Sequence, residues 1–359
     1  MHYLRPFFIA IILVGISQYS TAEDAHSDHA TEFDPVEMIM HHIGDAHEWH
    51  VYSYTDSKDE QHHISIPLPI ILINNGALHF FFSSSFHHGE SLVKKGDTYY
   101  KLYHEKIYIT DAKGTIHYDD NHQIINAKPW DFSITKNVTS MWLSILLILL
   151  LFISAARKYK AKPETPRGLQ SFLEPLILFV RDDIAVAQIG KEKADRFMPY
   201  LLTLFFFIWI NNLIGLIPFF PGGSNLTGNI SLTLVLALIT FVVTNINGSK
   251  SYWGHIFWMP GVPVPIRFLL SIIEFIGLFT KPFALMIRLL ANITAGHIII
   301  LSLFSLIFVM KSVAIAPVSI LMALMMFMLE ILVAVLQAYI FTLLSALFIG
   351  MAVQEAEHH

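Results

Sequence analysis

The sequence contains no cysteine among its 359 residues, which excludes disulfide bonds and metal or cofactor sites held by thiolates. Charged residues are also scarce, because only 14% of the chain is Asp, Glu, Lys or Arg. The net charge is −5, and no basic block indicates a nucleic-acid partner. Hydrophobic residues instead make up 54% of the chain, which excludes an ordinary soluble protein and predicts a membrane protein.

The first 22 residues have the pattern of a secretory signal peptide. Arg5 provides a positive start, and a short apolar stretch follows at 7–16. Ser20 and Ala22 are small residues at the positions that precede a cleavage point. We predict cleavage near Ala22, with a short uncleaved anchor as the alternative.

Residues 23–136 are soluble in character, because they contain most of the histidines and many charged residues. The segment 97–120 is rich in Tyr, Ile and Thr, and Lys113-Gly114 lies between two alternating runs. This pattern predicts a β-hairpin that turns at Lys113-Gly114. We therefore expect a small β-containing domain on the export side, whose role the sequence does not assign.

The histidines of this region raise the question of a metal site. His47 and His50 are three residues apart and could share a metal, as could the adjacent His41 and His42. No fixed ligand pattern recurs, however. Dispersed, solvated histidines are therefore the favoured interpretation, and we expect no metal and no cofactor in the chain.

From residue 137 the chain is strongly apolar. Membrane-embedded backbone must satisfy its own hydrogen bonds, so the apolar segments are expected to be helices. About five membrane helices are predicted, the last two of them long: 137–156, 197–217, 230–246, 266–310 and 318–353. They are separated by polar or proline-containing breaks, the last of which covers 311–317.

Charge placement predicts the orientation of these helices. The positive segment 157–162 follows the first span, and such an excess of Lys and Arg marks the cytoplasmic side. Residues 168–196 mix apolar and charged residues at helical spacing and are expected to lie along the cytoplasmic surface. The predicted fold is thus an all-α polytopic membrane protein with an N-terminal extracytoplasmic β-containing domain. Its parts are a signal peptide at 1–22, that domain at 23–136 and the membrane region at 137–359.

The last two predicted helices contain few polar side chains. These are Glu274, Arg288, Asn292 and His297 in the first helix and Glu330 and Gln337 in the second. Arg288 has no carboxylate within a helical turn on either side, although a charge at bilayer depth costs several kcal/mol. By helical periodicity Glu274 lies about 21 Å from Arg288 on nearly the same face, whereas His297 points to the opposite face.

An antiparallel hairpin about the break at 311–317 brings these polar residues to common levels. One register puts Gln337 level with Arg288 and Glu330 level with His297. Packing between helices could by itself explain Gln337 and Asn292. It explains His297 with Glu330 less well, because both side chains are titratable and are of the residue types that form proton relays. A neutral glutamine cannot balance Arg288, so we expect its anion to come from another chain or a substrate.

The membrane part of the sequence resembles a known family. "RLLANITAGHIII" (288–300) and "EILVAVLQAYIFTLL" (330–344) look like the a subunit of the F-type ATP synthase, particularly its mitochondrial form. Further segments match in the same order, namely 211–218, 228–241 and 274–288. The resemblance covers about 165–353 and does not include 23–136. It implies a stator of membrane helices, two of them long, tilted and packed against a rotating ring of c subunits.

The resemblance also implies roles for individual residues. Arg288 matches the essential arginine of the family, with Asn292 and Gln337 as its polar neighbours. His297 and Glu330 match the half-channel pair on the export side. The histidine comes first along the chain and the glutamate second, which is the order of the mitochondrial members.

Glu274 matches an acidic residue near the cytoplasmic exit, and Asn212 matches a polar position on the export side. Gly215 departs from the pattern, since many bacterial members have an acid there. The lining of the inlet is therefore left open in detail.

The implied activity is proton flow through two offset half-channels that drives ring rotation and ATP synthesis. The chain itself would carry no catalytic site. The implied partners are the c-subunit ring with its membrane carboxylate, the b subunits of the peripheral stalk, the remaining synthase subunits and the lipid bilayer. The implied location is a bacterial inner membrane, with 23–136 in the periplasm and the C-terminus in the cytoplasm.

Two other functions remain open from the sequence. A secondary transporter would also carry intramembrane charges, but it usually shows repeated halves, and no internal repeat is found. An anchored export-side binding protein would need only one of the predicted helices. Protons are favoured as the coupling ion because His297 can relay a proton, although sodium is not excluded.

Overall fold

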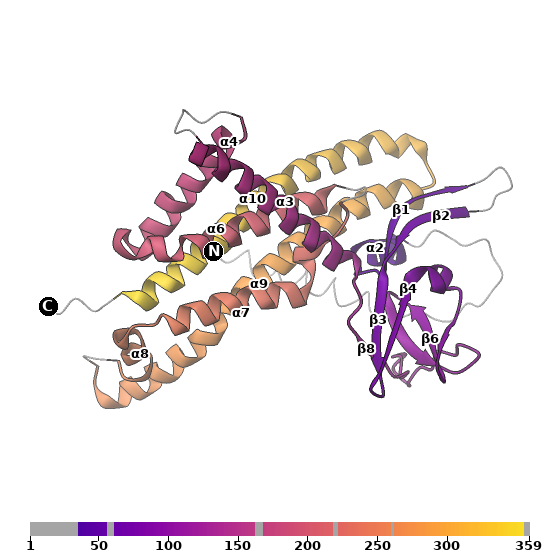
Figure 1. The fold of residues 1–359 in the computed structure, drawn as a ribbon, viewed down its shortest axis with the longest axis horizontal. Helices are drawn as coiled ribbons and strands as arrows, with labels where there is room; N and C mark the ends of the chain where they lie inside the picture. Colours follow the sequence, from indigo (N-terminus) through magenta and orange to yellow (C-terminus); the bar gives the residue numbers. More distant parts are fainter. Residues whose placement is uncertain (1–34, 56–60, 162–167, 218–221, 260–261, 355–359) are drawn as a thin grey trace, which may run out of the picture. The chain divides into compact units, whose positions relative to one another are not determined.

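The computed structural model describes residues 35–359 except for 56–60, 162–167, 218–221, 260–261 and 355–359. The predicted signal peptide at 1–22 lies outside the described residues. Two kinds of structure follow one another along the described chain, first short strands and then long helices (Figure 1).

The strands of the described part of the chain form three small antiparallel sheets. After helix α2 (Pro35–Ile43), β1 (Glu48–Thr55) pairs with β2 (Gln61–Pro67). In the second sheet β3 (Pro69–Asn74) lies between β4 (Ala77–Phe82) and β8 (Trp130–Asp131). The third sheet has the order β5 (Val93–Lys95), β6 (Thr98–Tyr103) and β7 (Lys106–Thr110). The predicted β-containing region is therefore confirmed.

The second and third sheets share a hydrophobic core. Strand alternation directs Ile70, Leu72 and Phe81 to one face of the β4–β3–β8 sheet, where they are buried. They pack with Tyr100 and Ile107 of the third sheet.

The prediction of a hairpin turn at Lys113-Gly114 is wrong. The chain turns nine residues earlier, at His104 and Glu105, whose φ angles of 45° and 60° are those of a two-residue hairpin turn. Around Lys113 the Asp111 carboxylate instead accepts hydrogen bonds from the backbone N–H groups of Lys113 and Thr115, at 3.1 and 2.9 Å. These bonds close a local turn after β7 and do not join two strands.

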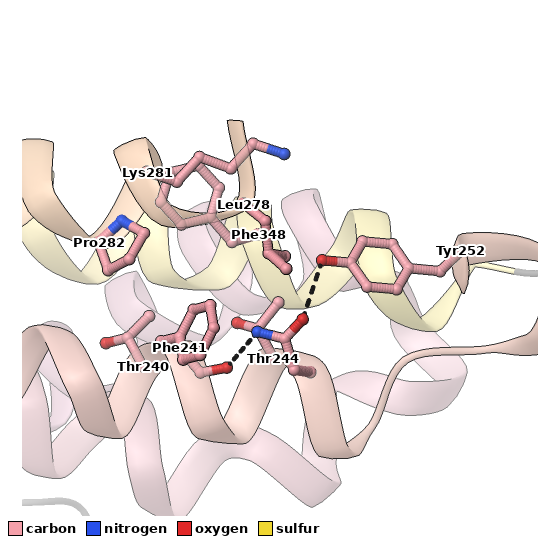
Figure 2. A pocket seen from close by; sticks show the side chains of 9 residues that line it. Thr240, Phe241, Thr244, Tyr252, Leu278, Lys281, Pro282 and Phe348 are labelled. Carbon is pink, nitrogen blue, oxygen red and sulfur yellow. Dashed lines mark hydrogen bonds between the residues drawn. The ribbon is translucent and has the colours of Figure 1, made fainter. Parts of the chain in front are cut away.

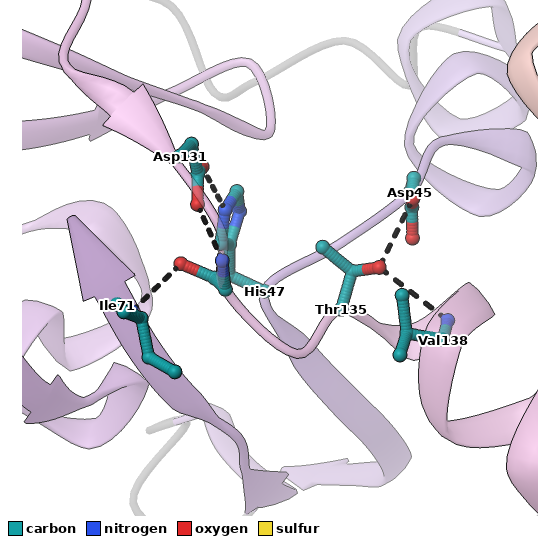
Figure 3. Close-up of polar contacts among 7 residues, drawn as sticks. Asp45, His47, Ile71, Asp131, Thr135 and Val138 are labelled. Carbon is teal, nitrogen blue, oxygen red and sulfur yellow. Dashed lines mark hydrogen bonds and ion pairs between the residues drawn. The ribbon is translucent and has the colours of Figure 1, made fainter. Parts of the chain in front are cut away.

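The expectation of solvated histidines is wrong for His47. Its side chain is buried, and its Nε2 lies 2.7 Å from Oδ2 of Asp131, 84 residues away in the chain (Figure 3). Burial raises the pKa of Asp131, but hydrogen bonds from His47 and Ser133 outweigh it, so this pKa lies below its usual value. His47 thus joins the start of β1 to β8 by a buried polar contact.

Figure 3 also shows how β8 continues into the first long helix, α3 (Lys136–Ala161). The hydroxyl of Thr135 donates to the carboxylate of Asp45 at 3.1 Å, and the same carboxylate accepts from the N–H of Asn137. The N–H of Lys136 donates to the carbonyl of Ala46 at 2.9 Å. The first turn of α3 is therefore hydrogen-bonded to the segment that precedes β1.

The predicted membrane helices are present. Among the described residues, four helices are long and apolar enough to cross a bilayer: α3, α6 (Lys191–Leu216), α9 (Val264–Val309) and α10 (Ala316–Val353). Helices α7 (Ile230–Ile246) and α8 (Lys250–Phe257) are bent by 105° and add a fifth if the pair is one span. The fold class predicted from hydropathy is therefore confirmed.

The boundaries near the surface helix differ from the prediction. The segment predicted as 168–196 forms α4 (Leu169–Phe179), a π-helical stretch (Val180–Val186) and the short α5 (Ala187–Ile189). It ends at Gly190, whose φ of 95° breaks the helix, so α6 begins six residues before the predicted 197. Helix α8 was not predicted; its start is capped by the Ser249 hydroxyl, which accepts from the N–H of Tyr252.

Helices α9 and α10 form the expected antiparallel hairpin. The break contains Lys311 at a positive φ and a short 3₁₀ turn (Val313–Ile315), within the predicted 311–317. Near it, the hydroxyl of Ser319 in α10 donates to the carbonyl of Leu303 in α9. This geometry determines which polar residues of the two helices meet.

Candidate functional site

His297 of α9 and Glu330 of α10 meet inside the helix bundle. His297 Nδ1 lies 2.8 Å from Glu330 Oε1, and only 3% of the Glu330 side chain is exposed. The predicted register, with Glu330 level with His297, is therefore confirmed. A buried acid and base at ion-pair distance can pass a proton between them.

The other side of His297 faces the end of α6. Its Nε2 lies 3.3 Å from the carbonyl oxygen of Gly215. A Cβ built on Gly215 would lie only 2.9 Å from the carbonyl oxygen of Ser224. The acid that many bacterial members have at this position therefore does not fit here without a backbone shift.

Asn212 adds a second buried polar group close to the pair. Its Nδ2 donates to the carbonyl of Ala334, one turn after Glu330 in α10, at 3.4 Å. Its Oδ1 accepts from the hydroxyl of Thr227 at 2.6 Å. The structure thus brings three of the predicted site residues, Asn212, His297 and Glu330, into one polar region.

Several members of this region were not predicted from the sequence. Thr227 belongs to the loop between α6 and α7, and Ser224 of the same loop donates to Asn137 Oδ1 of α3 at 2.6 Å. All three residues are buried. Their polar character inside an otherwise apolar half of the chain was the available signal, since buried polar groups need hydrogen-bond partners.

Arg288 and Asn292 lie on a different face of α9. Both side chains are exposed, whereas Leu289 and Ile293 between and beside them are buried. Within the part of the chain that the structure describes, no carboxylate forms an ion pair with Arg288. Its charge is therefore presented on a surface that this chain leaves uncovered.

Gln337, predicted at the level of Arg288, points into the bundle and is only 2% exposed. No hydrogen bond joins Gln337 to Arg288 among the described residues. The two residues are therefore level along the helix axes, but their side chains lie on different faces of the hairpin. The register alone did not predict a contact between them.

Glu274 has a partner that was not predicted. Oε1 of Glu274 lies 3.6 Å from Nζ of Lys281, seven residues later on the same face of α9. Nζ of Lys281 also lies 6.0 Å from the centre of the Phe348 ring in α10. The seven-residue spacing was the signal in the sequence, because residues two turns apart share a helix face.

Lys281 lines a pocket between α7, α8, α9 and α10 (Figure 2). Tyr252 reaches into it from α8, and its hydroxyl donates to Asn245 Oδ1 at 3.4 Å. Deeper in the bundle, Thr240 is hydrogen-bonded to the hydroxyls of Tyr200 and Ser345, at 2.7 and 3.3 Å. A series of hydroxyl and amide groups therefore runs from the bundle core toward the Glu274–Lys281 pair.

Comparison with known proteins gives two family matches. Residues 138–350 match the family described as ATP synthase A chain. Residues 38–132 match a domain of unknown function. The two matches separate the helical part of the chain from the part that contains the strands.

Three similar proteins are each named ATP synthase subunit a. The one from Chloroherpeton thalassium is 48% identical over 64% of this chain and 69% of its own length. The one from Anaeromyxobacter sp. is 47% identical over 64% of this chain and 56% of its own length. The one from Myxococcus xanthus is 44% identical over 64% of this chain and 76% of its own length.

Proposed function

The chain belongs to the ATP synthase a-chain family, the non-catalytic proton-channel stators of Fo, and from this premise we propose how its residues carry protons. It is a multi-pass membrane subunit of a bacterial F-type ATP synthase. Membership of this family removes the grounds for a secondary transporter or an anchored binding protein.

The proton inlet is formed by the buried pair of His297 and Glu330, together with Asn212. Their closeness supports this role, because Nδ1 of His297 and Oε1 of Glu330 are 2.8 Å apart. Asn212 and Thr227 supply further hydrogen-bonding groups beside the pair. Buried water or a proton needs such groups in succession to cross an apolar region.

Arg288 separates the two half-channels and faces the ring of c subunits. The observation that carries this proposal is an exposed cation on an apolar helix, without an ion-pair partner among the described residues. A ring carboxylate that rotates past the guanidinium is held in its ionised form and releases its proton toward the exit. Arginine suits this role better than lysine because it does not deprotonate in proteins. Asn292, one turn away, and the buried Gln337 flank it as polar neighbours.

The exit half-channel passes Glu274. Its pairing with Lys281, at 3.6 Å, and the hydrogen bond between Tyr252 and Asn245 nearby support a polar path there. Each proton that crosses the membrane supplies about 2.3 kcal/mol per 100 mV, and this work turns the ring.

The topology follows from charge and from the signal-like start. Residues 1–22 form a cleaved signal peptide, 23–136 lie in the periplasm and 137–359 form the membrane part, with the C-terminus in the cytoplasm of the bacterial inner membrane. The specific partners are the c ring and the b subunits of the peripheral stalk.

Replacing Arg288 with alanine tests the central proposal. Arg288→Ala should abolish ATP-driven acidification of inverted membrane vesicles, while native gels show an assembled complex. The same assay in sodium-free buffer should give an undiminished wild-type rate if protons are the coupling ion.

Arg267→Ala is the matched control on the same helix. Its guanidinium is hydrogen-bonded to the carbonyl of Val262 and stacks on Trp258, so it has a local structural role near the start of α9. Arg267→Ala should keep most of the pumping. Near-normal pumping by Arg288→Ala would contradict the proposal.

A further inference from the structure

Large apolar side chains line one face of the β4–β3–β8 sheet. Leu78, Phe80 and Phe82 alternate along β4, and Trp130 and Phe132 come from β8 and the residue just after it. Phe80 is directly opposite Ile71 of β3, while Leu78 and Trp130 are both opposite Ile73. Residues directly opposite in antiparallel strands point to the same side, so these residues form one surface, here called the aromatic sheet face.

The aromatic sheet face is open. Its Leu78, Phe80, Phe82, Trp130 and Phe132 are between 49% and 75% exposed, whereas the reverse of the sheet is packed into the core. Within the described ranges of the chain, no helix or strand buries these side chains. Soluble proteins rarely expose a contiguous apolar patch of this kind unless it is a site of interaction.

The aromatic sheet face is held close to the point where the chain enters the membrane. Phe132 precedes Lys136, the first residue of α3, by four residues, a span of at most about 14 Å. This connection is not a loose linker, because the N–H of Ile134 donates to the carbonyl of Pro69 in β3. The first turn of α3 is in turn hydrogen-bonded to Asp45 and Ala46.

The chemistry of the face matches a bilayer surface. Its strand positions hold Trp, Phe, Leu, Ile and Pro without a charged side chain. Tryptophan concentrates at the boundary between headgroups and acyl chains, and Phe and Leu accompany it on protein surfaces that lie in this boundary. In α3 itself, Trp142 is exposed six residues after the helix begins, as expected for a ring at that boundary.

We propose that the aromatic sheet face binds the lipid surface and rests on the headgroup region of the bilayer that α3 enters. The membrane thereby covers the apolar residues that the chain leaves open. This contact would orient the β-sheet region against the membrane beside the proton path. It requires only that α3 spans the bilayer and does not depend on the roles assigned to Arg288 or His297.

Spin labelling of the synthase in proteoliposomes tests the proposal. Because the chain has no cysteine, Phe80→Cys introduces a single attachment site for a nitroxide, and the unmodified complex gives the background from other subunits. The label should be more accessible to oxygen, which concentrates in lipid, than to a water-soluble nickel chelate. Leu78→Cys is a second reporter on the same face if Phe80→Cys fails to assemble.

Ala112→Cys is the matched control. Ala112 is exposed in the turn after β7, a strand of the sheet that packs on the opposite side of the core. Its label should be more accessible to the nickel chelate than to oxygen. The proposal is overturned if the label on the aromatic sheet face behaves like the one at position 112. It is equally overturned if that label is shielded from both reagents, which would indicate a protein partner.

Discussion

Gly296→Ala tests the inlet by moving one carboxylate without changing any charged residue. Gly296 lies next to His297 in α9, directly against the side chain of Glu330. A Cβ built on Gly296 would lie 2.7 Å from Oε1 of Glu330 and 3.0 Å from its Cδ. The buried carboxylate must therefore move, and the contact with His297, now 2.8 Å, should be lost.

The size of the effect follows from that contact. If this contact is worth as much as a hydrogen bond to a charged group, about 1.5–3 kcal/mol, its loss corresponds to about 10–150-fold in the population of the paired geometry. Alanine favours a helix over glycine by about 1 kcal/mol, so α9 itself should not be destabilised. We therefore expect proton entry to fall by about tenfold or more while the complex still assembles.

The assay is ATP-driven acidification of inverted vesicles, followed with a pH-sensitive dye, together with passive proton flow after the catalytic part has been removed. Gly254→Ala is the control, because a Cβ built on this helical glycine of α8 meets no atom within 4 Å. It should pump like the wild type. A Gly296→Ala complex that assembles and pumps at the wild-type rate would refute the reasoning that the His297–Glu330 contact supports proton entry.

Three further predictions concern the relay pair, the β-sheet region and the topology. The double exchange His297→Glu with Glu330→His should recover part of the pumping that each single change removes, because a relay needs one acid and one base. A double variant that pumps no better than the worse single variant would argue against a shared site. Asp131→Asn should lower the free energy of unfolding of the β-sheet region by about 1–3 kcal/mol at pH 7, measured by protease resistance of the solubilised complex. Burial raises the pKa of Asp131, but hydrogen bonds hold it below its usual value. The stabilisation is therefore present above about pH 4 and is lost as the pH falls further. At such low pH the free energy of unfolding of the variant should approach that of the wild type. Protease added to intact spheroplasts should cut within 23–136 and spare 355–359; protection of the former segment would overturn the proposed orientation.

The sequence by itself determined the features that depend on solvent and on helical periodicity. Uncharged runs long enough to span lipid can only be helices, so the membrane helices were predictable with errors of a few residues at their ends. The hairpin break near Lys311 followed from the polar interruption of the apolar run, and the level shared by His297 and Glu330 followed from antiparallel pairing of the two helices about that break. The exposed position of Arg288, opposite to His297, was also predictable, because nine residues advance a helix by about two and a half turns.

Tertiary structure alone decided the contacts between residues far apart in the chain. The burial of His47 against Asp131 spans 84 residues, and the bond between Asn212 and Ala334 spans 122. The pocket beside Lys281 draws its lining from four helices. Local patterns predict which faces of an element are apolar, but they carry no information about which distant element packs there. That choice depends on the simultaneous packing of all the helices and strands, and so the aromatic sheet face was recognised as unpartnered only once the rest of the fold was in place.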